Sequence, residues 1–181
     1  MIIKIIMCLI GILKLYLYKL FNWKKLCINL KMAIHPSVSL ELGKNSRLTL
    51  GKMVSIRKNV QINARNNAEI KIGNHSFLNT GCILTAHERI DIGDDVEFGP
   101  NVLIFDHDHK FKSGYKAKEF DCAEVKIGDN VWIGANTVIL RGTNIGNDCV
   151  VGAGSVLKGS YEAGQLIYDN RQTIKKIINK K

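Results

Sequence analysis

The chain has 181 residues, of which 46% are hydrophobic, so it is long enough for one domain with a continuous core. Its net charge of +10 would by itself favour nucleic acid as a partner. However, the segments 1–36 and 171–181 hold 11 of the 26 basic residues and no acid, which leaves 15 basic residues against all 16 acids between them. This near-neutral middle argues against a nucleic-acid-binding body.

The five cysteines are odd in number and widely spaced, and none forms a C-x-x-C pair. This pattern argues against a disulfide framework or a zinc knuckle, and it predicts a reducing, cytoplasmic location. We expect Cys82 and Cys149 to be small core residues, because both occupy the small-residue position of the repeat described below.

Residues 1–35 are predicted to form an amphipathic helical segment. The longest uncharged run, from Ile5 to Leu13, falls short of the ~20 residues of a membrane-spanning helix. Wound at ~100° per residue, the polar side chains gather on one side of the helix: Lys4, Lys14, Lys19, Asn22 and Lys25. The pattern predicts that residues 1–25 lie on an anionic membrane surface, peripheral to the inner face of the cell membrane. A helix packed on the body of the protein or on a partner subunit is the alternative.

A six-residue period dominates residues 127–158, and neither a helix nor an alternating strand produces that period. The period is carried by aliphatic residues: Ile127, Ile133, Ile139, Ile145, Val151 and Leu157. Four residues after each, up to Ser155, comes a small or β-branched side chain: Val131, Thr137, Thr143, Cys149 and Ser155. Between them come residues that tolerate a left-handed backbone: Asn130, Asn136, Gly142, Asp148 and Gly154. The pattern predicts short parallel strands joined by sharp corners, coiled as a triangular prism with the aliphatics inside.

The same cadence begins imperfectly at Leu42, in sets whose register is expected to slip at the corners. With ~18 residues per coil, the prism is predicted to span 36–165 in five to six coils. The interval from Ile104 to Ile127 is too long for one step, so a loop is expected at about 107–124, where function is often placed. The segment 166–181 is predicted to form a short basic helix that covers the last coil.

Histidines mark the point where the repeat breaks into this loop, in the sequence FDHDHKF at 105–111. A neutral imidazole can take a proton from an alcohol, as acyl transfer to a hydroxyl requires. Either His107 or His109 could be this base. Asp106 or Asp108 could orient the imidazole or could be a solvated carboxylate. We expect His75 and His87 to be structural, because both fall at the left-handed turn position.

These repeats resemble the hexapeptide repeat of the all-β, left-handed parallel β-helix. The segments GPNVLIFDHDH and KIGDNVWIGANTVI are similar to the active-site segment of the hexapeptide O-acetyltransferases that use acetyl-CoA, such as galactoside and maltose acetyltransferases. Aligning Pro100, Val102 and Ile104 with that family places its histidine on His109. The resemblance covers roughly residues 40–170.

The resemblance implies a role for several other residues. His109 would be the general base, Asn79 would position the acceptor, and Trp132 would form a wall near acceptor and thioester. The amide of Ala135, after Gly134, would face the oxyanion. The pantetheine arm of the cofactor would run beside Ala153, Gly154 and Lys158. Arg171 in the basic tail would meet the CoA phosphates. The family builds its sites between neighbours in a homotrimer.

The expected function is therefore an acetyl-CoA-dependent O-acetyltransferase, without a metal, that acts on a sugar hydroxyl of a surface polysaccharide or its lipid-linked precursor. Acetyl transfer is expected by direct attack in a ternary complex. An acidic acceptor contact of the sugar acetyltransferases is replaced by Ala86, so the acceptor is expected to differ from theirs. The alternatives are an N-acetyltransferase of a nucleotide-linked amino sugar, a γ-carbonic-anhydrase-like zinc enzyme using His107 and His109, and an inactive scaffold.

Overall fold

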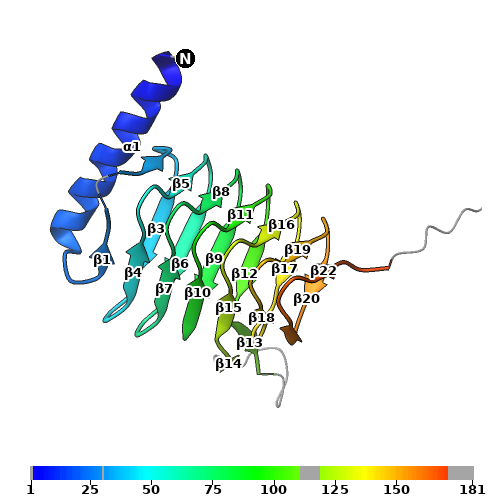
Figure 1. The fold of residues 1–181 in the computed structure, drawn as a ribbon. Coiled ribbons are helices and arrows are strands. Elements are labelled where there is room, and N and C mark those ends of the chain that lie inside the picture. The colour runs from blue at the N-terminus through cyan, green and yellow to red at the C-terminus, as the bar shows by residue number, and fades with distance from the viewer. Residues whose placement is uncertain (1, 30, 111–118, 171–181) are drawn as a thin grey trace, which may run out of the picture.

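The computed structural model describes residues 2–29, 31–110 and 119–170. In these residues an N-terminal helix, α1 (Ile2–Phe21), lies across one end of three parallel sheets wound as a triangular prism (Figure 1). The chain visits the three faces in a fixed order, B then C then A, so each face is built from strands of successive coils. We name an edge of the prism by the two faces that the chain joins there.

Each face is a ladder of short strands. Face A contains β1 (Leu26–Cys27), β4 (Arg47–Leu50), β7 (Glu69–Ile72), β10 (Arg89–Ile92), β15 (Val125–Ile127), β18 (Asn144–Ile145) and β21 (Ser160–Tyr161). Face B contains β2 (Ala33–Ile34), β5 (Ser55–Ile56), β8 (Phe77–Leu78), β11 (Glu97–Phe98), β16 (Trp132–Ile133), β19 (Val150–Val151) and β22 (Leu166–Ile167). Face C contains β3 (Ser39–Leu42), β6 (Gln61–Ala64), β9 (Ile83–Ala86), β12 (Leu103–Phe105), β17 (Val138–Ile139) and β20 (Val156–Leu157).

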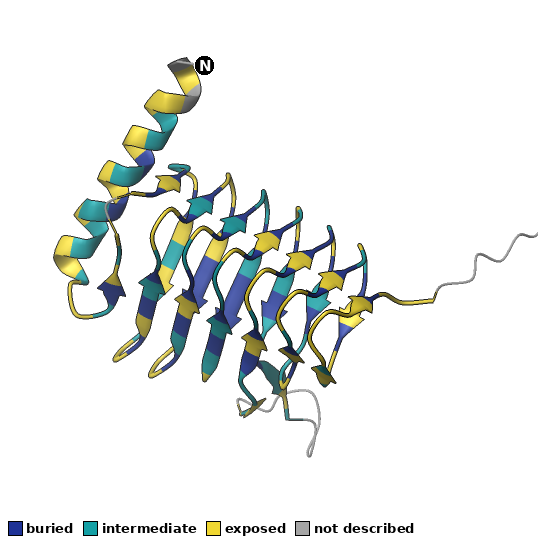
Figure 2. Cartoon of the chain, in the orientation of Figure 1, coloured by how far each residue is buried: buried dark blue, intermediate teal, exposed yellow. Residues whose placement is uncertain are grey.

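The interior is the predicted column of aliphatic side chains. Ile133, Ile139 and Ile145 are completely buried, and burying one such side chain contributes roughly 1.5–3 kcal/mol. The corner residues Asn130 and Asn136 have φ of 55° and 58°, as the six-residue pattern predicted. The buried band runs through every coil in Figure 2. Cys82 and Cys149 are buried in the same column, which confirms them as small core residues.

The early coils are longer than expected, and the prediction that the register slips at the corners was wrong. Ile34 stacks on Ile56 with a spacing of 22 residues, whereas Ile133 stacks on Val151 with a spacing of 18. The extra residues lie within four-residue strands, which place two side chains inside the prism instead of one. In β4, for example, both Leu48 and Leu50 are buried.

The predicted loop leaves the prism at the C–A edge. It begins and ends as an antiparallel hairpin of β13 (His107–His109) and β14 (Phe120–Cys122), in which His107 lies opposite Cys122 and His109 opposite Phe120. The hairpin therefore holds the two candidate histidines on a defined strand that is attached to the end of face C.

Helix α1 packs on the first coil with its polar side. Leu15 is buried there, and the backbone of Ile34 leaves no room for a side chain at Gly11. The Lys14 ammonium donates hydrogen bonds to the carbonyls of Pro36 (2.8 Å) and Val38 (3.0 Å). Of the expected polar stripe, Lys25 also reaches a body carbonyl, that of Leu42, while the side chain of Lys4 is outside the described residues. The expected alternative, a helix packed on the body, is what the structure contains.

The outward side of α1 is apolar. Its large exposed side chains are Ile3, Ile5, Ile6, Leu9, Ile10, Leu13, Leu17, Leu20 and Phe21. In the described part of the chain, no helix has the length and apolar character needed to cross a membrane.

The prism ends with β22. Its residues Leu166 and Ile167 are the first described part of the segment expected to be a C-terminal helix, and they form a strand instead. Residues 171–181, which include Arg171, lie outside the described residues.

Candidate active site

The buried carboxylate of Asp106 organises the histidines at the C–A edge. Asp106 has no exposed surface, and its oxygens accept hydrogen bonds from the backbone N–H groups of His87 (2.8 Å) and Glu88 (2.7 Å). The Nδ1 atom of His107 lies 3.1 Å from the same carboxylate. Of the two open interpretations of Asp106, the structure supports the one in which this carboxylate orients an imidazole.

His87 and Phe120 complete an aromatic cluster around His107. The ring centroids of His87 and His107 are 4.1 Å apart, and Phe120 packs 4.1 Å from His87 and 5.2 Å from His107. Burial first, and the neighbouring His107 second, hold the pKa of His87 below its usual value. This pKa shift favours the neutral imidazole of His87 at physiological pH.

His87 corrects a sequence expectation. His75 has φ of 56° and sits in a left-handed turn as expected, but His87 is not among the described residues with positive φ. The earlier strands are longer than six-residue counting assumes, so His87 falls at the end of β9 and faces the hairpin. The clue that sequence reasoning missed is the 20-residue spacing between His87 and His107, which equals the local coil length, since Thr85 pairs with Phe105.

His109 lies further out on the hairpin. Its imidazole is exposed, and its ring centroid is 4.7 Å from that of Phe120. His107 is therefore the histidine held by a carboxylate, whereas His109 is the one open to an incoming molecule.

Asp108, between the two histidines in sequence, turns to a pair of cations instead. Its carboxylate lies 2.6 Å from Nε of Arg141 and 3.6 Å from Nζ of Lys158. The hydrogen bond from Arg141 is the main reason that the pKa of Asp108 is lowered. These two ion pairs attach the hairpin to the following coils. They also show that Lys158 lies close to the histidine-bearing strand.

The other residues expected at the cofactor gather at the B–C edge. Gly134, Ala135, Ala153 and Gly154 occupy stacked corners there, and the Gly154 amide donates to the Ala135 carbonyl at 2.7 Å. A Cβ at Gly134 would lie 2.5 Å from the amide nitrogen of Ala153, so only glycine fits. Within the described residues the amide of Ala135 donates to no protein acceptor.

Trp132 lies beside this corner on face B, where its side chain is 49% exposed. It pairs with Val150, which in turn pairs with Leu166, and all three side chains are exposed. These residues form an apolar ladder on the outside of the prism.

Asn79 occupies the same B–C edge nearer the N-terminal end. It lines a cleft of about 710 Å³ between the prism and α1, together with Thr80, Arg57 and Lys58. The opposite wall of this cleft includes Ile3 and Met7 of the helix. Asn79, the residue expected to position the acceptor, therefore shares a cleft with apolar side chains of α1.

These two groups do not meet within one chain. His107 and His109 lie where face C ends, whereas Asn79, Ala135 and Ala153 lie where face C begins. About five residues separate the two edges, which is roughly 16 Å at ~3.3 Å per strand residue. A site that uses both groups needs the C–A edge of one chain against the B–C edge of another.

The described part of the chain contains no group of three or more His, Cys, Asp and Glu side chains arranged to hold a metal ion.

A family model described as "Bacterial transferase hexapeptide (six repeats)" matches residues 124–159. Residues 124–159 are therefore similar to the hexapeptide repeats of bacterial transferases. A lipopolysaccharide biosynthesis O-acetyl transferase of Escherichia coli, described as putative, is 35% identical to this chain over 94 residues. The match covers 46% of this chain and 48% of that protein. Galactoside O-acetyltransferase of Escherichia coli is 33% identical over 87 residues, 48% of this chain and 43% of that protein. The chain spans about half the length of the curated relatives it matches.

The solved structures extend the fold comparison to most of this chain. AntD, an N-acyltransferase from Bacillus cereus solved with dTDP and 3-hydroxybutyryl-CoA, superposes with a TM-score of 0.68 at 19% identity, over 81% of this chain and 79% of AntD. The prism is thus a left-handed β-helix of the type found in hexapeptide acyltransferases, which confirms the expected fold class.

Proposed function

We propose that the chain is an acetyl-CoA-dependent acetyltransferase that acts on a sugar hydroxyl of a surface polysaccharide or its precursor. The observation that carries this proposal is a histidine-bearing hairpin inserted into a hexapeptide-repeat prism. Support comes from the similarity to two O-acetyltransferases and from the acyl-CoA held by a protein of the same fold.

The proposed reaction is a direct transfer. The imidazole of His109 takes the proton of the acceptor hydroxyl while the hydroxyl oxygen attacks the thioester carbonyl. The C–S bond then breaks, the acetyl group stays on the acceptor as an ester, and the sulfur leaves as CoA with a proton returned from the imidazole. The free amide of Ala135 is suited to bind the oxyanion that forms between these steps.

His107 is the second candidate for the base. The carboxylate of Asp106 at its Nδ1 would fix the proton there and leave Nε2 free to accept another. His109 has the access, and His107 has the orienting partner.

A homotrimer would complete the proposed site. The histidines and the cofactor corner lie at opposite edges of face C, and rotation about a threefold axis can bring opposite edges of neighbouring chains together. Asn79 would then position the acceptor, and Trp132 would border acceptor and thioester, with the pantetheine arm beside Ala153 and Gly154. Lys158 would act near the same site from the hairpin side.

The decisive experiment measures CoA release from acetyl-CoA with a sugar acceptor for His109→Ala and His107→Ala. We expect the variant that lacks the base to lose activity by about 10²–10⁴-fold and to bind acetyl-CoA as before. Wild-type activity in both variants would refute the mechanism. His75→Asn, at a distant turn, is the control.

Transfer to nitrogen is the second candidate, because AntD is an N-acyltransferase with the same fold. The product decides between the two: mild base removes an O-acetyl ester and leaves an amide intact. The expected product is base-labile.

We further propose that α1 attaches the enzyme to the inner face of the cell membrane and so to lipid-linked acceptors. Support comes from Lys14 of α1 and Lys25 after it, which reach carbonyls of the body, and from the aliphatic side of α1, which is exposed. The cationic end of the molecule supports this orientation, since residues 1–60 contain 11 basic residues and one acid, Glu41.

Flotation with vesicles of phosphatidylglycerol and phosphatidylethanolamine tests the attachment. We expect the wild-type protein to float with the vesicles. The variant Ile6→Glu/Leu13→Glu, altered at exposed positions of α1, should remain in the bottom fraction of the gradient. Met53→Glu, at an exposed position of the prism, is the matched control. Equal behaviour of all three proteins would contradict the proposal.

A further inference from the structure

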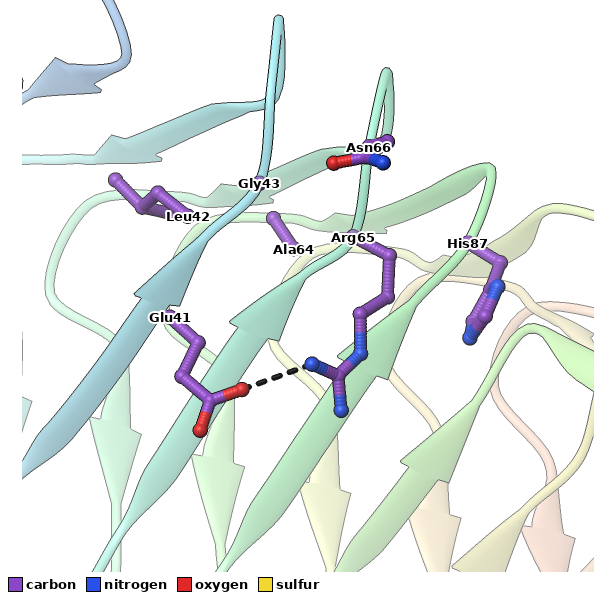
Figure 3. Close-up of a pocket in the computed structure, with 7 residues that line it drawn as sticks. All are labelled: Glu41, Leu42, Gly43, Ala64, Arg65, Asn66 and His87. Atoms are coloured by element: carbon purple, nitrogen blue, oxygen red, sulfur yellow. Dashed lines mark hydrogen bonds and ion pairs between the residues drawn. The ribbon is translucent and has the colours of Figure 1, made fainter.

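A polar pocket lies on the C–A edge, on the N-terminal side of the histidine cluster. Its volume is about 520 Å³, within the range of ~300–1,000 Å³ that is common for small-molecule sites. The pocket is lined by the ends of β3 and β6 and by His87 beyond β9 (Figure 3). None of its residues belongs to the proposed catalytic or cofactor set.

The pocket and the cluster follow one row of equivalent positions. Leu42 pairs with Ala64, Ala64 with Ala86, and Thr85 with Phe105. The residues at the corner of four successive coils are therefore Gly43, Arg65, His87 and His107. At ~4.8 Å between strands, this row runs roughly 14 Å. Its first member, Gly43, also lines the pocket.

The side chains of this row suit sugar hydroxyls. In Figure 3, Arg65 and Glu41 project on the same side as His87, and Arg65 Nη1 lies 2.8 Å from Glu41 Oε2. Their side chains are 48% and 60% exposed, so the ion pair contributes little to stability. A guanidinium supplies several donors and a carboxylate supplies acceptors, which together match neighbouring hydroxyl groups of one sugar.

The row also leads to the reaction centre. The ring of His87 lies against that of His107, and its backbone N–H is held by Asp106. A sugar bound at Arg65 and Glu41 would therefore be followed, one or two sugar residues along, by a sugar next to the hairpin.

We propose that this edge is an extended subsite for an oligosaccharide chain. Arg65 and Glu41 bind a sugar residue away from the acetylated one, and His87 contacts the residue between them. The inference rests on the proposed function and narrows its substrate class, because a single sugar cannot occupy the hairpin and the Arg65 pocket together.

Binding can be tested without catalysis. In protein labelled with ¹⁵N-histidine, the ring signals of His87 are assigned with His87→Gln and followed during titration with gluco-, galacto- and N-acetylglucosamine oligosaccharides of one to six units. We expect at least one hexamer to bind tenfold or more tightly than its monosaccharide. We expect Arg65→Gln to remove most of this difference. No shift at His87 with any oligosaccharide, or equal affinity for one unit and six, would overturn the proposal.

Kinetics provides the second readout. With acetyl-CoA and the hexamer, Arg65→Gln and Glu41→Gln are expected to raise the acceptor KM about tenfold, with kcat and the KM for acetyl-CoA unchanged. Lys71→Gln, which breaks a comparable exposed ion pair with Asp91 on face A, is the matched control. An unchanged acceptor KM in Arg65→Gln would refute the subsite while leaving the acetyltransferase intact. If the wild-type protein transfers no acetyl group but its His87 ring signals still shift on addition of oligosaccharide, the acetyltransferase proposal is refuted instead.

Discussion

The carboxylate of Asp106 lies 3.1 Å from Nδ1 of His107 and accepts two backbone hydrogen bonds from the preceding coil. One buried anion thus connects the last coil before the hairpin to the imidazole on the hairpin. The prism therefore contributes to the position of the His107 imidazole, together with the pairing of β13 with β14.

Replacing Asp106 with Asn is expected to destabilise the fold and to reduce activity together. The amide keeps the shape but loses the charge, and one of its two polar atoms cannot accept a hydrogen bond. Poorly satisfied buried groups of this kind cost about 1–3 kcal/mol, which urea denaturation would measure. Asp121→Asn, at an exposed position of β14, should match wild type. Equal stability of both variants would show that the buried anion does not hold the hairpin.

The stability of the protein is expected to fall as the pH is lowered from about 6.5. The pKa of His87 is lowered in the folded protein by burial, whereas the unfolded chain titrates near ~6.5. Between the two pKa values the unfolded state binds more protons, so the free energy of unfolding rises with pH in that window and is at its full value above it. Urea midpoints between pH 5 and 8 would show a smaller slope in His87→Gln. His75→Asn is the control, and an unchanged slope in His87→Gln would contradict this assignment.

Val150→Asp is expected to dissociate the proposed trimer. Val150 lies between Trp132 and Leu166 in the exposed apolar ladder on face B, and a carboxylate buried there without a partner is costly. Sedimentation should show a change from three times the 20.2 kDa chain to the single chain. Asn144→Asp, exposed on face A, should stay assembled. A Val150→Asp protein with the wild-type sedimentation coefficient would exclude this ladder from the interface.

Gly134→Ala is expected to cost more stability than Gly152→Ala. The added methyl group would lie 2.5 Å from the backbone of Ala153 in the first case. In the second it would meet the Cβ of Tyr168 at 2.9 Å, a longer approach to a residue that follows the last strand. Overpacking against backbone costs typically 1–3 kcal/mol. Thermal denaturation of the two variants would compare them, and equal melting temperatures would disprove the close contact at the B–C edge.

Much of the prism could be predicted because each step is local. A buried aliphatic, a small residue and a left-handed corner recur at fixed spacing, and Ile133, Thr137 and Asn136 show all three where they were expected. The excursion was also predictable, since the distance from Ile104 to Ile127 exceeds one step.

The surroundings of the histidines could not be read in the same way. Whether Asp106 is solvated depends on the end of a strand in the previous coil, and six-residue counting misplaced that end by two residues. His87 was assigned to a turn for the same reason. The pairing of Asp108 with Arg141 joins residues 33 positions apart, across an excursion whose path the local pattern does not encode.

The spacing between stacked residues on face B shrinks along the axis, from 22 residues at Ile34 and Ile56 to 16 at Val151 and Ile167. The circumference of the solenoid therefore tapers, and it is widest beneath α1. A repeat with a fixed length of six residues fits the coils of the narrow half, whereas the coils of the wide half are longer. A domain boundary drawn by repeat length alone would cut through a single uninterrupted column of packed side chains.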